Sequence, residues 1–559
     1  MAATPVDTLE VIPGTEIIFD NQAQDGEGSG TAGGGELVLI PRPTGNRDDP
    51  LNWSAGWKAT VLVNQFVFVF VSIMTPLAIA PMTMIFELEF DKTLPEVNML
   101  FGAAAITLGY ANFVIVPAAN VWGRRPVVLV CGLVCILANV WQGLVTGYGS
   151  FIGARVISGL GAAANESIMP MVVADMLFVH QRGRSMALYF WAYFIGLFIG
   201  PIISGVIASR LSWRWFFWVC TILQAASFIF LLVAHPETKY ERARLSSSPG
   251  ATQVYIAADA GKAEGGEASE AGAYQPAQNE AQATTTTNKT HTHITNGGPS
   301  RAQFGLLPPG GRFHATRASV LRDVVSPLRI LFLYPIVAWA SLAMGFAANS
   351  LLALNLTQAQ VFGSPLGPYV FSADEIGYVN FAFAVGAALA LVTAGPLSDA
   401  VALRRARKNG GVLEAEMRLP ALIPYVAVNL VGMVVVAVGY QRAWPWEAIV
   451  VLGYTLVGVQ VVGIPAIAIS YAVDSYKTLP GEIMIAATIV KNTFGFGMIF
   501  YYNNWAAKSG YIAPVLLLMA LTVGFSVIGL AVFIPFGKKF RRYNLDYRKE
   551  ACSTRQREY

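Results

Sequence analysis

Long apolar segments, separated by short polar loops, recur along most of the chain. Each is long enough to cross a hydrocarbon layer about 30 Å thick, which takes about 20 residues of α-helix. Because the segments are apolar nearly all round, their length and flanking charges identify them better than a helical period does. The pattern predicts twelve transmembrane helices, at residues 57–80, 98–119, 126–147, 150–175, 185–208, 214–234, 330–355, 376–397, 419–440, 447–472, 482–504 and 512–536.

Basic residues are concentrated in every second loop of this arrangement. If the N-terminus is cytosolic, the cytosolic segments contain Arg124, Arg125, Arg182, Arg184, Arg404, Arg405, Arg407, Lys408, Arg418, Lys477, Lys538, Lys539, Arg541 and Arg542. The loops on the other side contain only Lys92, Arg210, Arg214, Arg442 and Lys508. Cytosolic loops of membrane proteins carry an excess of Lys and Arg. Both termini are therefore predicted to be cytosolic.

Two polar, low-complexity stretches accompany the apolar segments, one covering the first fifty residues and one near residues 240–325. Such stretches cannot bury enough apolar surface to fold. The whole chain is 54% hydrophobic and 13% charged, whereas soluble domains carry about 25% charged residues. We therefore expect an all-α membrane protein with a disordered cytosolic tail (1–56), a six-helix bundle (57–235), a disordered cytosolic linker (236–328), a second six-helix bundle (329–537) and a cytosolic C-terminal tail (538–559).

Three ionisable side chains lie well inside the predicted spans, namely Arg155, Glu166 and Lys491. A charge within hydrocarbon costs at least about 2.5–3.5 kcal/mol, so such residues suggest a function. Arg155 and Glu166 share one face of the fourth predicted helix, roughly 16 Å apart along its axis. All the histidines lie outside the predicted spans, at His180, His235, His291, His293 and His314. A proton relay through intramembrane histidine is therefore not expected.

Glu166 is the only carboxylate deep within a predicted span, which makes it the candidate proton carrier. Desolvation favours the neutral form of a carboxylic acid, so a buried carboxyl can exchange a proton. The alternative is that Glu166 merely hydrogen-bonds a neighbouring helix. Lys491 is expected to line a central cavity and to pair with Glu166 or with an anionic group of a substrate. The alternative for Lys491 is a static bridge between helices.

Short motifs with fixed spacing occur in and between the spans. The fourth span contains Arg155-x-x-x-Gly159-x-Gly161-x-Ala163, and the fifth contains Gly196-x-x-x-Gly200-Pro201-x-x-Ser204-Gly205. The loop after the second span ends in Gly123-Arg124-Arg125, and the end of the eighth span runs into Gly395-Pro-Leu-Ser-Asp399, followed by Arg404 and Arg405. Together with the two sets of six helices, these motifs resemble those of the major facilitator superfamily. The fifth-span motif resembles the antiporter motif of that family, with Ser204 in place of a glycine.

Further stretches resemble the fungal branch of the twelve-helix drug:proton antiporters. They are Asp49-Pro-Leu-Asn-Trp53, Trp213-Arg-Trp-Phe-Phe217 and Pro236-Glu-Thr-Lys-Tyr240. The resemblance implies alternating access, in which one half of the protein rocks against the other around a site at mid-membrane.

The resemblance also assigns expected roles to residues at matching positions. Arg155 is associated with proton transfer in the family, although it could instead hold carbonyl groups of an adjacent helix. Asn64, Asn349 and Gln460, on helices that line the cavity in the family, are expected to bind substrate together with Glu166 and Lys491. The residues expected to act in gating or conformational change are Gly196, Gly200, Pro201, Gly123, Arg124, Arg125, Asp399, Arg404 and Arg405. Asn120 stands where the family has an aspartate, which predicts a weaker latch on the first half.

The function that this pattern favours is proton-coupled antiport, exporting a small organic molecule such as a drug, toxin or secondary metabolite across the plasma membrane. We expect a monomer in the lipid bilayer, with protons as the coupling ion. The alternatives are uptake of a nutrient or cationic solute such as a polyamine, a vacuolar location and, less favoured, a membrane sensor that does not transport. The sequence shows no nucleophile–base set, phosphate-binding loop or metal-ligand cluster. No enzyme activity, cofactor, metal or nucleic-acid partner is therefore expected.

Overall fold

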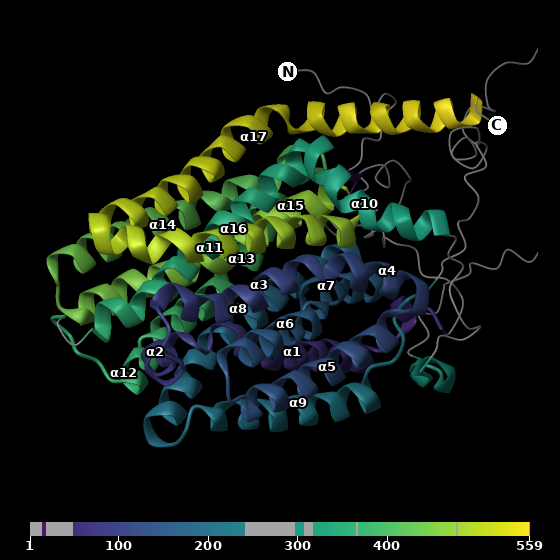
Figure 1. Cartoon of the computed structure of the whole chain (residues 1–559). Helices are drawn as coiled ribbons and strands as arrows, with labels where there is room; N and C mark the ends of the chain where they lie inside the picture. The colour runs from purple at the N-terminus through teal and green to yellow at the C-terminus, as the bar shows by residue number, and fades with distance from the viewer. Residues whose placement is uncertain are drawn as a thin grey trace, which may run out of the picture.

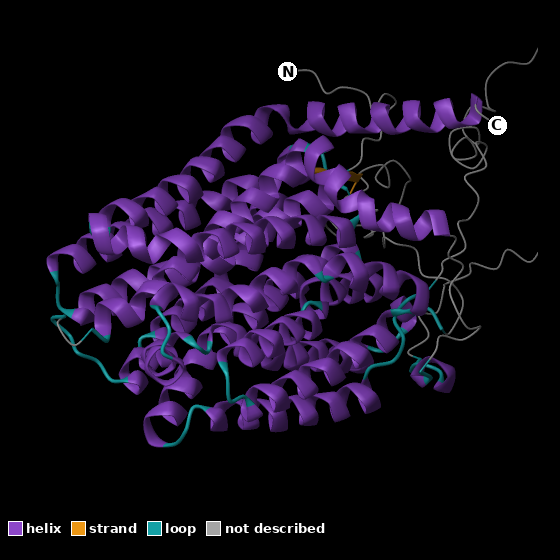
Figure 2. Ribbon diagram, in the orientation of Figure 1, coloured by secondary structure: helices purple, strands orange, loops and turns teal. Residues whose placement is uncertain are grey.

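The computed structural model of the chain describes residues 14–17, 48–240, 297–306, 317–364, 367–476 and 479–557, which are almost entirely helical (Figures 1 and 2). The first half contains α1 (Ala55–Leu77), α2 (Thr83–Phe90), α3 (Leu94–Tyr110), α4 (Asn112–Trp122), α5 (Arg124–Leu144), α6 (Tyr148–Ala162), α7 (Ala164–Met176), α8 (Val179–Arg210) and α9 (Arg214–Ala234). The second half contains α10 (Arg317–Leu333), α11 (Pro335–Phe362), α12 (Ala373–Tyr378), α13 (Asn380–Lys408), α14 (Ile423–Arg442), α15 (Thr455–Ser475), α16 (Pro480–Ser509) and α17 (Ile512–Arg557).

Short segments of other secondary structure join these helices. The 3-10 helices are η3 (Pro50–Asn52), η4 (Ala80–Met82), η5 (Arg301–Phe304) and η6 (Ala415–Leu422), and η7 (Ala448–Tyr454) is a π-helix. The strands β1 (Thr15–Ile17) and β2 (Val412–Glu414) form an antiparallel pair in which Thr15 is opposite Glu414. Much of the predicted tail 1–56 and linker 236–328, with His291, His293 and His314, lies outside the described residues.

Twelve stretches of described helix are long and apolar enough to cross a membrane, which confirms the predicted number. They are Ala55–Phe90, Leu94–Trp122, Arg124–Leu144, Tyr148–Met176, Leu188–Arg210, Arg214–Ala234, Pro335–Phe362, Ala373–Lys408, Ala415–Gln441, Ala448–Ser475, Pro480–Ser509 and Ile512–Asn544. Several run past the apolar segments predicted from the sequence. Helices can continue into water where polar residues follow, so hydropathy underestimates their length.

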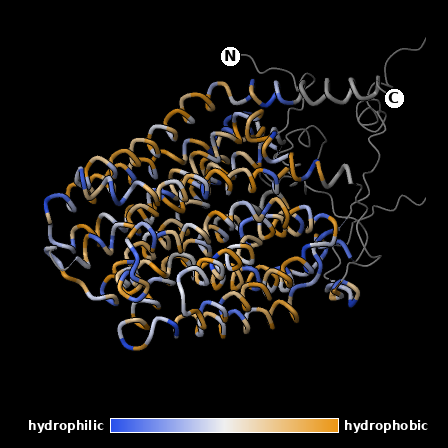
Figure 3. The backbone as a smooth tube through the Cα atoms, viewed as in Figure 1, coloured by the Kyte–Doolittle hydropathy of each residue, from blue (hydrophilic) through white to orange (hydrophobic). Residues whose placement is uncertain are grey.

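The helices form two groups that lie side by side. In Figure 1 the helices before residue 240, drawn in purple and blue, lie below most of those after residue 317, drawn in teal to yellow, with the short helix α12 as the exception. Contacts between the groups join α3 and α7 to α16, and α8 to α12 and α13. Figure 3 shows hydrophobic residues along the lengths of the helices and hydrophilic residues concentrated at their ends.

The two ends of the bundle can be distinguished by the segments that meet there. At one end, which we call the linker end, residues 48–54, 235–240 and 297–306 are joined by hydrogen bonds such as Ser54 N–H to Gly297 O (3.0 Å) and Glu237 N–H to Gln303 O (2.8 Å). At the other end, which we call the opposite end, lie the turns that follow α2, α8 and α11. Strands β1 and β2 lie at the linker end, because β2 follows the last turn of α13.

The outer surface of the bundle is apolar, as a lipid-facing surface requires. Helix α5 illustrates this, because side chains three or four positions apart (Val130, Leu133, Leu137, Trp141 and Leu144) are all exposed. Its other face, which includes Cys131 and Cys135, is buried against α6 and α9. With no water in the bilayer core, exposed apolar side chains on a helix whose backbone bonds are internally satisfied are the stable arrangement.

Small residues allow neighbouring helices to approach closely inside the bundle. A methyl group on Gly386 of α13 would lie 2.1 Å from the carbonyl oxygen of Thr455, and one on Gly458 of α15 would lie 2.5 Å from that of Phe383. On α6, a methyl group on Gly159 would lie 2.4 Å from the carbonyl oxygen of Ala104 on α3. The glycines of the fourth span therefore allow α6 to pack closely against α3 and α5.

Candidate functional site

Four polar side chains meet at the centre of the bundle, where α7, α8 and α16 come together. The Lys491 ammonium group pairs with Glu166 Oε1. The Tyr193 hydroxyl donates to the same oxygen at 2.7 Å and accepts from Lys491 Nζ at 2.7 Å. The Asn492 side-chain amide donates to Glu166 Oε2 at 3.2 Å. The cluster joins the two halves, because Glu166 and Tyr193 belong to the first and Lys491 and Asn492 to the second.

The helices position these residues through a small number of local features. Helix α6 ends at Ala162 and α7 begins at Ala164, so Glu166 falls in the first turn of α7. Lys491 and Asn492 are consecutive residues of α16, and a methyl group on Gly109 of α3 would lie 2.9 Å from Asn492 Cβ. The close packing of α3 on α16 at this glycine holds the Asn492 amide against the cluster.

The Glu166–Lys491 ion pair is removed from water. Glu166 is 1% exposed and Lys491 is 6% exposed. Lys491 Nζ also lies 4.5 Å from the centre of the Tyr193 ring, within the range of a cation–π contact. A buried charge pair is tolerated when the geometry is good and further hydrogen bonds satisfy its remaining donors and acceptors. Tyr193 and Asn492 supply those bonds.

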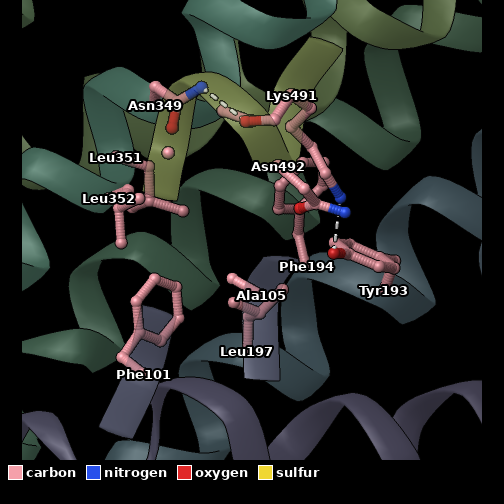
Figure 4. Close-up of a pocket in the computed structure, with 12 residues that line it drawn as sticks. Phe101, Ala105, Tyr193, Phe194, Leu197, Asn349, Leu351, Leu352, Lys491 and Asn492 are labelled. Atoms are coloured by element: carbon pink, nitrogen blue, oxygen red, sulfur yellow. Dashed lines mark hydrogen bonds between the residues drawn. The ribbon is translucent and has the colours of Figure 1, made fainter. Parts of the chain in front are cut away.

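A cavity opens beside this cluster. It is lined by Phe101, Ala105, Tyr193, Phe194, Leu197, Ala348, Asn349, Leu351, Leu352, Lys491, Asn492 and Gly495. Figure 4 shows the apolar side chains of Phe101, Ala105 and Leu197 from the first half facing Leu351 and Leu352 from the second. Lys491 is the charged residue of this lining, whereas Glu166 lies behind it and does not line the cavity. A mostly apolar pocket with a few polar groups is typical of a small-molecule site.

The structure brings one of the other expected substrate-binding residues to the cavity and leaves two elsewhere. Asn349 lines the cavity and donates to the carbonyl oxygens of Gly345 (2.7 Å) and Lys491 (3.1 Å). Gln460 instead connects α15 to α11 through Ser350 Oγ at 2.9 Å. Asn64 of α1 does not line the cavity, and its amide donates to the carbonyl oxygen of Phe230 in α9 at 2.8 Å. Both are fully buried contacts between helices.

Arg155 is fully buried in α6 and binds carbonyl groups of neighbouring helices. Its guanidinium donates to the carbonyl oxygens of Leu100 (2.8 Å) and Thr75 (3.2 Å) and to Gln142 Oε1 (3.3 Å). These contacts connect α6 to α3, α1 and α5 within the first half. The arrangement matches the alternative given above for this residue, in which it holds carbonyl groups of adjacent helices.

The glycines of the fifth-span motif hold α8 close to α1. A methyl group would lie 2.7 Å from Phe70 O if placed on Gly196, and 2.1 Å from Met74 O if placed on Gly200. Ser204, which replaces a glycine of the motif, donates to the carbonyl oxygen of Ala78 at 2.6 Å. Pro201 lies where α8 meets the other half, since a methyl group on Gly377 would lie 2.9 Å from its carbonyl oxygen.

At the linker end, the motif Gly123-Arg124-Arg125 connects the start of α5 to the end of α9. The carboxylate of Glu237 accepts the backbone N–H groups of Arg124 (2.9 Å) and Arg125 (3.1 Å) and so caps the start of α5. In return, the Arg125 guanidinium donates to carbonyl groups at the end of α9, including that of Leu232 at 2.8 Å. Gly123 has φ +97° and leaves no room for a side chain beside Glu237. The free N–H and C=O groups of two helix ends are thereby satisfied.

The corresponding cluster in the second half has a different arrangement from the expected one. Asp399 lies 3.8 Å from Arg418, which also pairs with Asp474 at 2.9 Å. Arg404 and Arg405, expected to act beside Asp399, are exposed on the last turns of α13. The basic partner of Asp399 therefore comes from η6.

Several residues of the site were not singled out from the sequence. Tyr193 and Asn492 are not among the candidate residues given above, and Glu237 is named there only within the stretch Pro236-Glu-Thr-Lys-Tyr240. In the sequence, Asn492 directly follows Lys491, and Tyr193 is a polar aromatic residue within the predicted span 185–208. These positions are the features from which both residues could have been predicted. Among the described residues, no group of three or more His, Cys, Asp or Glu side chains is placed to hold a metal ion.

Comparison with known proteins places this architecture among transporters. The family model described as Major Facilitator Superfamily matches residues 61–498. An uncharacterized MFS-type transporter of Schizosaccharomyces pombe is 27% identical over 90% of this chain and 88% of its own length. Protein HOL1 of Saccharomyces cerevisiae is 25% identical over 96% of both chains. The probable efflux pump mfs2 of Aspergillus flavus is 23% identical over 81% of this chain and 96% of its own.

A solved structure of the proton:xylose symporter XylE superimposes with a TM-score of 0.54 at 12% identity, covering 87% of this chain and 96% of that one. At this identity the likeness concerns the fold. It agrees with the two groups of helices and the twelve spans described above.

Proposed function

The chain belongs to the major facilitator superfamily, and from this membership we propose that it is a proton-coupled exporter of a small organic molecule. Members of the family are secondary transporters and not enzymes. Alternating access exposes a central site first to one side of the membrane and then to the other. The cavity beside Lys491, with walls from both halves, is the proposed substrate site.

The observation that carries the proton-coupling proposal is the position of Glu166. Its carboxylate receives Lys491 from the other half and Tyr193 from its own half. When Glu166 takes up a proton, it loses the charge that holds the Lys491 ammonium group. The contact between α7 and α16 then weakens, and the relative free energy of the two conformations changes. One proton at this site can thus be coupled to movement of the halves.

The remaining residues support this site in different ways. We propose that Lys491, Asn492 and Asn349 contact the substrate, because they are the cavity's charged and amide groups. Arg155 serves the proton site indirectly, by fixing α6 and hence the start of α7. Gly196, Gly200 and Pro201 act in conformational change through the close contacts that α8 makes with α1 and α12.

Two observations support export over uptake. The fifth-span motif, with its glycines packed against α1, resembles that of antiporters, and one relative is named a probable efflux pump. Uptake of a cationic solute such as a polyamine is supported less, because Lys491 and not Glu166 lines the cavity. The charge of the loops supports a cytosolic linker end. We propose the plasma membrane as the site of action, with a fungal drug:proton antiporter as the nearest functional type.

The proposal is tested by transport into proteoliposomes with an imposed pH gradient. Rhodamine 6G and radiolabelled spermidine serve as probes, and wild type is compared with Glu166→Gln. Glu447→Gln is the matched control, because Glu447 is exposed at the opposite end. We expect gradient-driven accumulation of rhodamine 6G that Glu166→Gln abolishes and Glu447→Gln leaves unchanged. Accumulation of rhodamine 6G that is unchanged by removing the pH gradient and by Glu166→Gln would refute proton coupling. Accumulation of spermidine but not of rhodamine 6G would favour the cationic-solute alternative.

A further inference from the structure

A hydrogen bond between the two halves at the linker end involves a carboxylate outside the motifs described above. Asp323 of α10 accepts the side-chain N–H of Asn120, near the end of α4, at 2.9 Å. The two residues are 203 positions apart in the sequence. Both side chains are half-buried. Helix α10 contacts α4 of the first half as well as α11 and α16 of the second.

The amide of Asn120 is suited to this place because it both donates and accepts. Its oxygen accepts from the Arg124 guanidinium at 3.1 Å, which fixes the amide orientation, and its nitrogen then faces Asp323. Arg124 also pairs with Asp175 at 3.1 Å. An aspartate at position 120 could accept from Arg124 in the same way. It could not donate to Asp323, and the two carboxylates would repel each other.

The position of Asp323 also determines what this bond does during transport. Its helix leads directly into α11, so Asp323 moves with the second half, whereas Asn120 is fixed to the first half through Arg124. The Lys239 ammonium group binds the backbone carbonyl of Asn120 and adds a further contact to the first half. Opening the linker end by rocking the halves apart must therefore break the Asn120–Asp323 bond.

We propose that Asp323 is a gating residue, which supplies from α10 the carboxylate of a latch that holds the linker end closed. In this latch Asn120 is the neutral donor, held in place by Arg124, and Asp323 is the charged acceptor. The proposal rests on the alternating access of the proposed function. It does not depend on proton coupling at Glu166 or on the direction of transport.

The latch can be tested by cross-linking the halves at the linker end. A methyl group on Gly481 of α16 would lie 3.6 Å from Met171 Cγ on α7, so Met171→Cys with Gly481→Cys places two thiols within bonding reach. A protease site inserted between residues 241 and 296 allows the linker to be cut afterwards. The halves then migrate together on a gel only if the disulfide has formed. The full-length protein without the two new cysteines gives the background.

The rate of copper-catalysed disulfide formation is compared among Asn120→Asp, Asp323→Asn, the double exchange and Arg322→Gln, all in the full-length protein without substrate or pH gradient. We expect Asn120→Asp to slow cross-linking by about tenfold or more, as for loss of a hydrogen bond to a charged group. Asp323→Asn should slow it less, because an amide at position 323 still accepts from Asn120. Arg322→Gln, an exposed charge one residue away, should have no effect.

The double exchange is the decisive variant. An aspartate at position 120 accepts from Arg124, and an asparagine at position 323 donates to it, so the bond is restored with its direction reversed. We expect cross-linking to return to within about twofold of the wild-type rate. The proposal is overturned if Asn120→Asp leaves the rate unchanged, or if the double exchange is as slow as Asn120→Asp alone. Because the readout is taken without substrate or gradient, failure of the Glu166→Gln transport test would leave this result standing.

Discussion

Neutralising either member of the Glu166–Lys491 pair should destabilise the folded protein, whereas neutralising both should have little effect. The pair is almost fully removed from water, at 1% and 6% exposure. Removing one partner of such a pair leaves a buried charge without its counter-charge, at a cost of about 3–5 kcal/mol. Removing both charges eliminates the pairing and the desolvation together, and such exchanges are often close to neutral.

The structure also predicts an order for the two single variants. In Glu166→Gln the Lys491 ammonium group retains the Tyr193 hydroxyl as acceptor, at 2.7 Å. In Lys491→Gln the Glu166 carboxylate retains two donors, Tyr193 at 2.7 Å and Asn492 at 3.2 Å. The remaining charge is better satisfied in the second case. Glu166→Gln should therefore be the least stable of the variants, and the double variant the closest to wild type.

The assay is a double-mutant cycle on the purified protein in one detergent at one pH, with thermal unfolding followed by intrinsic fluorescence and by size-exclusion chromatography. With each single variant costing about 3–5 kcal/mol and the double variant close to neutral, we expect a coupling free energy of about 6–10 kcal/mol between the two positions. Glu447→Gln and Lys508→Gln, both exposed at the opposite end, form the matched control cycle and should show no coupling. If the double variant loses as much free energy of unfolding as the two single variants together, the two positions are not coupled. The Glu166–Lys491 ion pair would then not hold the two halves together.

Three other predictions follow from particular contacts. Gly200→Ala should abolish recovery of folded protein, because the added methyl group would lie 2.1 Å from a carbonyl oxygen of α1, whereas Gly497→Ala, with no neighbour within 4 Å, should express normally. Burial and a nearby guanidinium lower the pKa of His235 to about 3. Since histidine in the unfolded chain takes up a proton near pH 6.5, stability should fall as the pH drops from 7 to 5, and His235→Gln should flatten this dependence in thermal unfolding. Asn349→Ala should raise the KM for transport several-fold, whereas Asn64→Ala should leave KM unchanged and lower stability by about 1 kcal/mol.

The number and order of the membrane spans could be predicted because hydrocarbon thickness and loop charge act on each segment separately. The interruptions within the helices could not. The first span runs through α1, η4 and α2, the fourth is divided between α6 and α7 at Ala163, and the tenth begins as the π-helix η7. These breaks depend on which neighbour each turn packs against, and hydropathy along one segment contains no information about its neighbours.

The candidate site was predicted in part. Burial of a charge is costly enough that Glu166 and Lys491 could be identified one residue at a time from their positions within spans. Tyr193 is an amphipathic side chain that is common in apolar segments for packing alone, so its hydroxyl contact required the three-dimensional structure. Asn64 and Asn349 look alike in the sequence, each an asparagine within a span. Which one reaches the cavity depends on the rotation of α1 and α11, and that rotation is set by packing.

Asn120 shows how a substitution within a motif can be misjudged when it is considered alone. Where the family has an aspartate, an asparagine predicts a weaker latch, and replacing Asn120 with aspartate would be expected to strengthen it. With Asp323 opposite, the same replacement brings two carboxylates together, and the expected effect has the opposite sign. The partner comes from a region that the sequence assigned to a disordered linker, so no local pattern could connect the two. The direction in which Asn120→Asp shifts the cross-linking rate therefore decides whether the latch belongs to the motif alone or to the motif together with α10.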